Sequence, residues 1–297
     1  MASFLSRLAP LALTLRGSKR MFSDPRKTLE RVEHLRLHPA KAEPRASISR
    51  HVDVKSRVID GWTVFDVSAR SGSNPARAVF LHGGCYVFEI DSLHWRFVAQ
   101  LVRETGTTIS VPIMPLAPAG QASVVVDKVA NLAQSLIAEV GAGKVSLIGD
   151  SSGGGMALAV AMELRDRKHE LLRAIVLSAP WLDVSGTDPK LAEIAPRDPW
   201  LAVPGTTAAG ALYRAELPES DWRVSPIHGE LVGLGPITVF TGTRDIVHAD
   251  ALRLLAKAEE QGIQIDFHVG EGMIHNYPIL PIPEGTAARA VVATAIS

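Results

Sequence analysis

The 297 residues suffice for one large α/β domain, because such domains often exceed the usual ~150 residues. Lysine plus arginine equals aspartate plus glutamate at 31 each, so the net charge favours neither nucleic acid nor an anionic membrane as a partner. No apolar run approaches the ~20 residues of a membrane-spanning helix. One cysteine allows no intramolecular disulfide, which agrees with a reducing compartment and predicts a cytoplasmic location.

The first 23 residues combine basic side chains with a short apolar stretch. Arg7, Arg16, Lys19 and Arg20 occur with no acidic residue before Asp24. A secretory signal is disfavoured because Arg16 stands where a small-residue cleavage site belongs, whereas a transit-like segment agrees with the charge alone. We favour an amphipathic cap helix that could also contact lipid, because apolar residues recur at helical spacing: Phe4, Leu5, Leu8, Leu11 and Leu15.

Strands and helices alternate from Trp62 onward. The pattern predicts strands at 62–69, 77–81, 107–112, 144–148, 172–177, 237–242 and 263–269, and helices at 92–105, 123–140, 154–165 and from 249. Such alternation predicts an α/β fold with a mostly parallel central sheet flanked by helices. The stretch 183–235 breaks the alternation with many prolines and short helical pieces near Leu191 and Ala208. The predicted domains are an N-terminal cap segment (1–50), a core (51–182 and 236–297) and a cap insertion (183–235).

The segment Gly149-Asp150-Ser151-Ser152-Gly153 joins an apolar strand to an alanine-rich helix. A G-x-S-x-G motif at such a junction predicts a nucleophile elbow. The turn is so sharp that side chains two positions before and after the serine would collide, which explains the two glycines. The amides at the start of the following helix would face the serine and stabilise anions there. Ser151, the central serine of the motif, is the predicted nucleophile.

Three further segments fall where the chemistry of such an elbow requires them. His82-Gly83-Gly84-Cys85-Tyr86 follows a strand, at the place where α/β-hydrolases carry the loop that donates oxyanion-hole amides. Asp245 lies just past the strand at 237–242, and His275 follows the last strand and a glycine-rich turn. The order nucleophile, acid, histidine is the order of this fold. The sequence therefore predicts a Ser151–Asp245–His275 triad.

The chain resembles the hormone-sensitive-lipase-like esterases, the bacterial family IV of the α/β-hydrolase fold. The segments that carry the resemblance are His82 to Cys85, Gly149 to Gly154, Thr243 to Asp245 and Gly272 to His275, with further similarity at Ala179 to Asp183 and Ser225-Pro226. The resemblance covers roughly residue 50 to the C-terminus. It implies a helical cap and a serine carboxylesterase for short-to-medium acyl esters, with neither metal nor cofactor. It also implies a small ester as the partner, no nucleic acid, and a homodimer as a candidate assembly.

Two residues depart from the H-G-G-G and G-D-S-A-G motifs of that family: Cys85 replaces the third glycine and Ser152 replaces the alanine. The family pattern implies an oxyanion hole made by backbone amides of Gly83, Gly84, Cys85 and Ser152. Cysteine resists the backbone conformations that glycine reaches, at a cost of ~1–2 kcal/mol, so we expect an ordinary φ at Cys85. A reactive Cys85 thiol is disfavoured because nothing cationic flanks it.

Other residues have assignments that compete with structural roles. Tyr86, Trp181 and Tyr213 are predicted to contact substrate, with Phe88, Trp95 and Trp200 as further candidates for the acyl pocket, although core packing competes for each. We expect His82 to hold its loop and three acids to serve structure rather than catalysis: Asp150, Asp183 and Asp250.

Three alternatives to an active carboxylesterase stay open. The same triad hydrolyses amides, lactones or thioesters, and the motif does not separate these reactions. A non-catalytic ligand-binding protein on this fold is a hypothesis from another class, and its expected signature, loss of the triad histidine, is missing because His275 is present. Misplacement of the oxyanion loop by Cys85 would give a folded but impaired enzyme.

Overall fold

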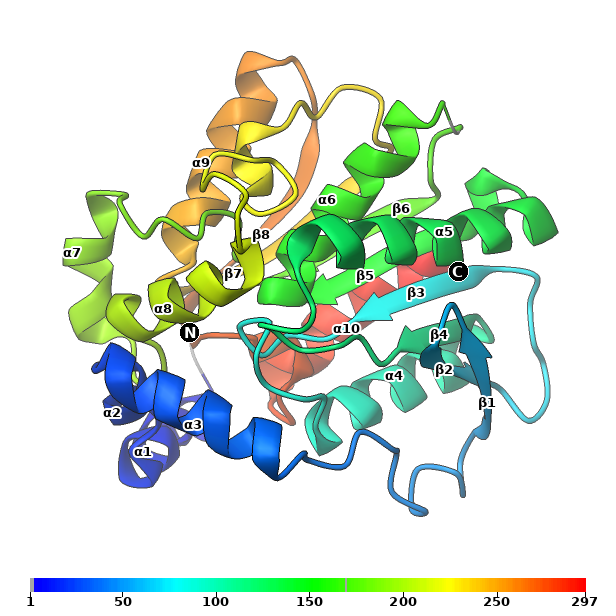
Figure 1. The fold of residues 1–297 in the computed structure, drawn as a ribbon. Coiled ribbons are helices and arrows are strands. Elements are labelled where there is room, and N and C mark those ends of the chain that lie inside the picture. Colours follow the sequence, from blue (N-terminus) through cyan, green and yellow to red (C-terminus); the bar gives the residue numbers. More distant parts are fainter. Residues whose placement is uncertain (1–2, 169) are drawn as a thin grey trace.

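One eight-stranded sheet organises the chain, and the computed structural model describes residues 3–168 and 170–297 around it (Figure 1). The strands are β1 (Asp53–Ile59), β2 (Trp62–Ser68), β3 (Arg77–Leu81), β4 (Thr108–Pro112), β5 (Val145–Asp150), β6 (Ala174–Ser178), β7 (Ile237–Arg244) and β8 (Ile265–Ile274). Their order is β1-β2-β4-β3-β5-β6-β7-β8, and only β2 runs antiparallel to its neighbours. The predicted α/β fold with a mostly parallel sheet is confirmed.

Helices cover both faces of the sheet (Figure 1). On one face lie α4 (Ser92–Thr105) and α10 (Pro283–Ile296), and on the other α5 (Ala122–Val140), α6 (Ser152–Asp166) and α9 (His248–Glu260). Successive residues of a strand point to opposite faces, so Ala78 and Phe80 of β3 belong to the core under α4 and α10, whereas Val79 and Leu81 belong to the core under the other three helices. Burial on both faces explains why the central strands are almost wholly apolar.

Two segments outside this layered core pack against each other at one end of the sheet. The first holds α1 (Phe4–Arg16), α2 (Ser18–Phe22) and α3 (Pro25–Leu37), and the second holds α7 (Lys190–Ile194) and α8 (Val203–Arg214). Their contact is close, because a Cβ added to Gly205 of α8 would lie 2.5 Å from the carbonyl oxygen of Phe22 and from the Thr28 hydroxyl. Helices therefore occupy both stretches that the sequence assigns to a cap.

The N-terminal part of α1 differs from the expected amphipathic helix, because its large apolar side chains face solvent. Phe4, Leu5 and Leu8 are exposed, and the side chains of Leu11 and Leu15 lie outside the described residues. In the part of the chain that the structure describes, none of the helices combines the length and apolar character needed to cross a membrane.

Several elements differ from the sequence-based expectation, among them α3, which the sequence pattern does not predict. Neither β1 nor α10 is predicted, because β1 is a largely exposed edge strand without an apolar face and α10 contains a glycine and several β-branched residues, which have low helix propensity. The last strand does not end at Val269. Instead β8 continues through the glycine-rich stretch to Ile274, because β7 pairs with it as far as Arg244, through a bulge. His275 therefore follows directly from a strand rather than from a turn.

Candidate active site

Ser151 occupies the one-residue junction between β5 and α6 in a strained conformation, with φ 54° and ψ −124°. The two flanking glycines permit this turn. A Cβ on Gly149 would lie 2.1 Å from the carbonyl oxygen of Gly153, and a Cβ on Gly153 would lie 2.0 Å from that of Leu81. The Ser151 amide donates to the carbonyl oxygen of Ser178 at 2.8 Å. The sharp turn and the glycine requirement are as the motif predicts.

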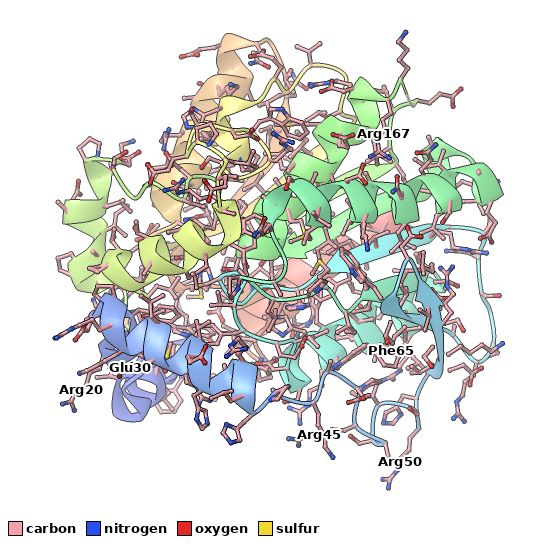
Figure 2. All side chains as sticks on the ribbon, viewed as in Figure 1. Arg20, Glu30, Arg45, Arg50, Phe65 and Arg167 are labelled. Atoms are coloured by element: carbon pink, nitrogen blue, oxygen red, sulfur yellow. The ribbon has the colours of Figure 1, made fainter. Side chains whose placement is uncertain are left out.

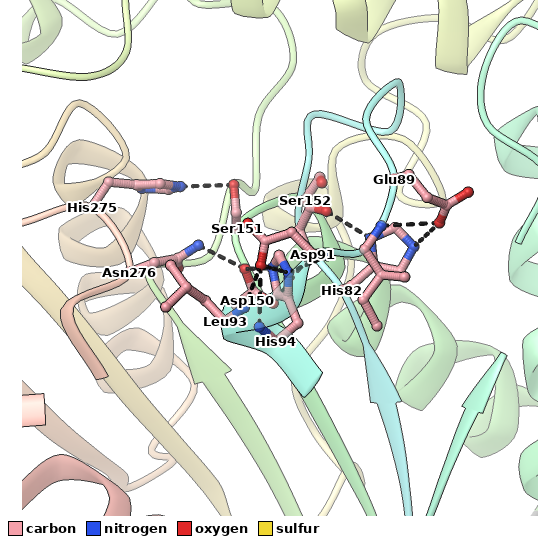
Figure 3. Close-up of polar contacts among 12 residues, drawn as sticks. His82, Glu89, Asp91, Leu93, His94, Asp150, Ser151, Ser152, His275 and Asn276 are labelled. Atoms are coloured by element: carbon pink, nitrogen blue, oxygen red, sulfur yellow. Dashed lines mark hydrogen bonds and ion pairs between the residues drawn. The ribbon is translucent and has the colours of Figure 1, made fainter. Parts of the chain in front are cut away.

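The structure brings the three predicted triad residues together. Figure 3 shows the contact between Ser151 and His275. Asp245 follows β7, His275 follows β8, and all three side chains are buried. The Asp245 carboxylate accepts from Nδ1 of His275 at 2.8 Å, and Nε2 of His275 lies 2.9 Å from Oγ of Ser151. With Nδ1 donating to Asp245, Nε2 is left to accept the Ser151 hydroxyl proton.

The charge of Asp245 governs the ionisation of His275. Burial by itself lowers the pKa of the imidazole, but the Asp245 carboxylate and its hydrogen bond outweigh burial, and the net pKa is raised. The indole of Trp200 meets the imidazole edge-on, with ring centroids 5.6 Å apart. The imidazole is therefore held by a carboxylate at one nitrogen and by an aromatic ring at its side.

Asp198 is a buried carboxylate beside the triad acid that the sequence analysis missed. It accepts from the amides of Trp200 at 2.7 Å, Leu201 at 2.9 Å and Ile246 at 2.9 Å. Burial and the nearby charge of Asp245 raise its pKa to about 6. Asp198 thus holds the backbone just after Asp245 and the segment that carries Trp200. The sequence Asp-Pro-Trp, which is typical of the start of a turn, is the signal that could have identified it.

The loop from His82 to Tyr86 lies against the elbow and supplies candidate oxyanion donors. The amide of Gly83 donates to Oδ1 of Asp150 at 3.0 Å, so the expectation that Gly83 contributes to the oxyanion hole is wrong. Within the described residues, the amides of Gly84, Cys85 and Ser152 have no hydrogen-bond partner. These three amides therefore remain the candidates for binding an oxyanion.

The expectation of an ordinary φ at Cys85 is also wrong. Its φ is 52° and that of Tyr86 is 65°. Both values follow from a tight turn in which the amides of Val87 and Phe88 donate to the carbonyl oxygen of Gly84 at 3.0 and 2.8 Å. The left-handed conformation at a non-glycine residue costs about 1–2 kcal/mol. Burial raises the pKa of the Cys85 thiol to about 12, so the thiol stays protonated and is no nucleophile at neutral pH.

The second departure, Ser152, acts through its side chain as well as its backbone. Its hydroxyl oxygen accepts from the amide of Tyr86 at 3.3 Å. An alanine at this position would leave that amide without its partner. Ser152 therefore ties the far end of the strained loop to the elbow, a role that neither residue type nor position in the motif indicates.

Asp150 braces the site from below, as expected of it (Figure 3). Besides Gly83 it accepts from Nδ2 of Asn276 at 2.6 Å, and Nε2 of His94 in α4 lies 3.3 Å from the same carboxylate. One buried carboxylate thereby connects the oxyanion loop, α4 and the residue after the triad histidine. His94 and Asn276 could not be identified from the sequence, because only the fold brings them to Asp150.

His82 holds its loop, as expected. Its Nδ1 donates to the carbonyl oxygen of Gly83 at 2.7 Å, and burial lowers its pKa to about 4, so the ring is neutral at pH 7. In a trans peptide the carbonyl and the following amide point in opposite directions. Because His82 holds the Gly83 carbonyl, the Gly84 N–H in the same peptide group points in the opposite direction, away from His82. His82 is therefore a positioning residue.

A cavity of about 320 Å³ opens beside Ser151. Two predicted aromatic residues, Phe88 and Trp200, line it, together with Met21, Phe22 and Arg31 from α2 and α3, which the sequence analysis missed. Tyr86, Trp181 and Tyr213, the predicted substrate contacts, are not among the residues that line this cavity. The Tyr86 and Tyr213 rings stack with centroids 3.6 Å apart, Trp181 packs on Tyr86, and all three are buried, so core packing, the competing interpretation, describes them.

Asp183 and Asp250 also serve structure, as expected. Asp250 accepts from the amides of Leu182 and Asp183 at 2.8 and 3.1 Å, and Arg253 donates to Asp183 at 2.6 Å. The remaining candidate, Trp95, packs edge-on against Phe65 in the core under α4, away from the cavity.

The elbow predicts a position-specific response to alanine. We expect Gly149→Ala to destabilise the protein by roughly 3 kcal/mol or more, because its Cβ overlaps backbone that cannot move without opening the turn. Gly143→Ala is the matched control, because its Cβ meets nothing within 4 Å and we expect a change below about 1 kcal/mol. Urea unfolding measures both, and equal changes would contradict the account.

The Ser152–Tyr86 hydrogen bond predicts a second pair of results. We expect Ser152→Ala to lower the free energy of unfolding by about 1 kcal/mol or more, because a buried amide loses its acceptor. Ser146→Ala is the control, since Ser146 is equally buried and its hydroxyl has no partner among the described residues. Thermal unfolding measures the stability of the two variants. If Ser146→Ala lost as much stability as Ser152→Ala, the hydrogen bond could not be the cause.

With this geometry established, known proteins provide a comparison. A triacylglycerol lipase of Mycobacterium tuberculosis is 30% identical over 228 residues, which are 76% of this chain and 47% of that lipase. This chain thus spans about half the length of that relative. An esterase of Acinetobacter venetianus is 26% identical over 217 residues, 72% of each chain.

A solved structure and a family description agree with these relatives. The crystal structure of an esterase from the bacterial hormone-sensitive lipase family has the same fold, with a TM-score of 0.82 and 23% identity over 100% of both chains. Residues 78–279 match a protein family whose description is "alpha/beta hydrolase fold". The matched residues include the loop from His82 to Tyr86 as well as Ser151, Asp245 and His275. This chain belongs to the α/β-hydrolase family.

Proposed function

We propose that the protein is a serine carboxylesterase that hydrolyses esters of short-to-medium acyl chains through an acyl-enzyme intermediate. The observation that carries the proposal is the continuous hydrogen-bonded chain from Asp245 through His275 to Ser151, which ends beside a cavity. Relatives named lipase and esterase support ester hydrolysis as the general reaction.

The first half of the reaction forms the acyl-enzyme. Oγ of Ser151 attacks the ester carbonyl carbon while Nε2 of His275 takes the hydroxyl proton. Asp245 stabilises the imidazolium that results. The tetrahedral intermediate then collapses, and His275 gives its proton to the leaving alcohol. In the second half, water attacks the acyl carbon with His275 again as the base, which releases the acid and restores Ser151.

The oxyanion of each tetrahedral intermediate needs donors that are already in place. The free amides of Gly84, Cys85 and Ser152 lie on the loop and helix end that meet at Ser151. Three features keep these amides oriented before substrate arrives: the Gly83 carbonyl held by His82, the Gly83 amide held by Asp150, and the Tyr86 amide held by Ser152. Removal of one donor from such a hole typically lowers kcat ~10²–10³-fold.

The cavity supports a limited acyl length. Its volume of about 320 Å³ lies at the small end of the ~300–1,000 Å³ range of ligand sites. Phe22, Phe88, Trp200 and Leu201 give its wall an apolar character suited to an acyl chain. A long chain such as palmitoyl would extend beyond it into water.

The acyl-length prediction is tested with p-nitrophenyl acetate, butyrate, octanoate and palmitate. We expect kcat/KM to peak at butyrate or octanoate, because longer chains overfill the cavity, and Ser151→Ala to lower turnover by at least roughly 10³-fold. A peak at palmitate would contradict the limited pocket. Undiminished turnover by Ser151→Ala would contradict the whole mechanism.

The raised pKa of His275 predicts the pH dependence of activity. Catalysis needs the neutral imidazole, and a pKa raised above its ordinary value of ~6.5 means that activity falls as the pH drops through that higher value. We expect Asp245→Asn to shift the acidic limb of the pH–activity profile to lower pH, and to lower kcat roughly 10³–10⁴-fold.

Profiles of kcat/KM against pH for both enzymes measure the shift. Asp166→Asn is the matched control, because Asp166 is an exposed acid at the far end of α6 and should leave the profile unchanged. An identical pH limb in wild type and Asp245→Asn would show that Asp245 does not set the pKa of His275.

A further inference from the structure

The N-terminal turns of α1 bury Ser6 and expose Phe4, Leu5 and Leu8, whereas Leu13 near the other end of the helix packs against the core. Ser3 and Ser6 face the body of the protein, where their hydroxyls donate to Glu284 of α10 at 2.9 and 3.2 Å. Ser6 is 4% exposed, whereas Phe4 is 75%, Leu5 52% and Leu8 43% exposed. A helix on the surface of a globular protein normally shows the opposite arrangement, with its apolar stripe against the core. The anchoring serines thus turn three large apolar side chains outward.

Half of the large exposed apolar side chains that the structure describes lie on the N-terminal helices. Of the ten large hydrophobic residues exposed among the described side chains, half lie in α1 and α3: Phe4, Leu5, Leu8, Leu29 and Leu37. Single exposed apolar residues are common on any protein surface. Three of them within two turns of one helix indicate instead that this surface binds a partner that the structure does not contain.

The charge of this region indicates which kind of surface makes that contact. Residues 1–50 hold 11 lysines and arginines and four aspartates and glutamates, a net charge of +7, although the whole chain has none. Arg7 is exposed within the apolar group, and Arg20, Arg45 and Arg50 lie along the lower edge of the molecule in Figure 2. Apolar side chains flanked by basic ones are typical of segments that bind anionic lipid surfaces. The balanced charge of the whole sequence conceals this asymmetry.

We propose that α1 docks the protein onto the surface of an anionic phospholipid bilayer. Phe4, Leu5 and Leu8 enter the boundary between headgroups and acyl chains, and the neighbouring arginines pair with lipid phosphates. The helix has 13 residues, too few to span a bilayer, so it lies in the plane of the surface. A second copy of the chain is a poorer occupant, because two faces of the same positive charge repel each other.

Docking would bring the cavity close to the lipid. Gly17 alone separates α1 from α2, and α2 contributes Met21 and Phe22 to the cavity beside Ser151. The docking surface and the cavity wall thus belong to one continuous segment. Lipid binding by this segment does not depend on catalysis, so it can be measured whether or not the protein hydrolyses esters.

Flotation with vesicles tests the proposal. We expect the full-length protein, and equally its Ser151→Ala variant, to float with vesicles of phosphatidylcholine and phosphatidylglycerol in equal parts and not with phosphatidylcholine alone. Added salt should weaken the binding, because it screens the basic side chains. The double variant F4D/L8D should lower the vesicle partition coefficient about tenfold or more.

Val58→Asp is the matched control, because Val58 is 73% exposed on β1 and carries the same change of chemistry away from α1. Circular dichroism verifies the fold of each variant, and the charge-reversed variant R7E/R20E gives a second reading should F4D/L8D fail to fold. The proposal is overturned if wild type does not bind anionic vesicles, or if folded α1 variants bind them as wild type does. It is also overturned if F4D/L8D only dissociates a dimer in gel filtration and leaves vesicle binding unchanged.

Discussion

The strained backbone of Ser151 is the constraint on which the rest of the site depends. A positive φ at this one residue turns the chain from β5 into α6 and leaves the hydroxyl exposed to His275 at the carboxyl edge of the sheet. The strain is tolerated because backbone packs on both sides of the turn, so closely that only glycine fits at positions 149 and 153. The packing around the two glycines therefore fixes the position of Ser151, the proposed nucleophile. The parallel neighbouring strands β7 and β8 place Asp245 and His275 at the same edge.

The neighbours of Ser151 in sequence hold the oxyanion loop. Asp150 accepts from the Gly83 amide, and the Ser152 hydroxyl accepts from the Tyr86 amide, so the two residues that flank the nucleophile grip the two ends of the loop. Cys85 lies between these attachments with a left-handed φ that glycine would adopt more cheaply. The two departures from the family motifs thus meet in one structure: the serine in place of alanine secures a loop that carries a cysteine in place of glycine.

Local sequence predicts what depends on local geometry. The sharp turn at Ser151, the order of strands and helices, and the meeting of Ser151, Asp245 and His275 follow from glycines at a sharp turn, apolar runs and residues placed at strand ends. Contacts between distant segments escape such reasoning. The φ of Cys85 arises from a turn whose hydrogen bonds end on the Gly84 carbonyl. Tyr86 does not line the cavity, because its ring stacks on Tyr213, a residue more than a hundred positions away in the sequence. Asp198 lies in a proline-rich insertion whose sequence shows no periodicity. Met21 and Phe22 of α2 line the cavity, but no sequence motif predicts how that helix packs.

The most direct test of the account is to locate the adduct formed by a fluorophosphonate, which reacts with a serine only when a base and an oxyanion hole activate it. The account predicts one phosphonyl group per chain, bound to Ser151 in tryptic peptides, and no adduct on Cys85 or in the Ser151→Ala variant. Absence of labelling in folded wild-type protein, or an adduct on another residue, would contradict the assignment of Ser151 as an activated nucleophile.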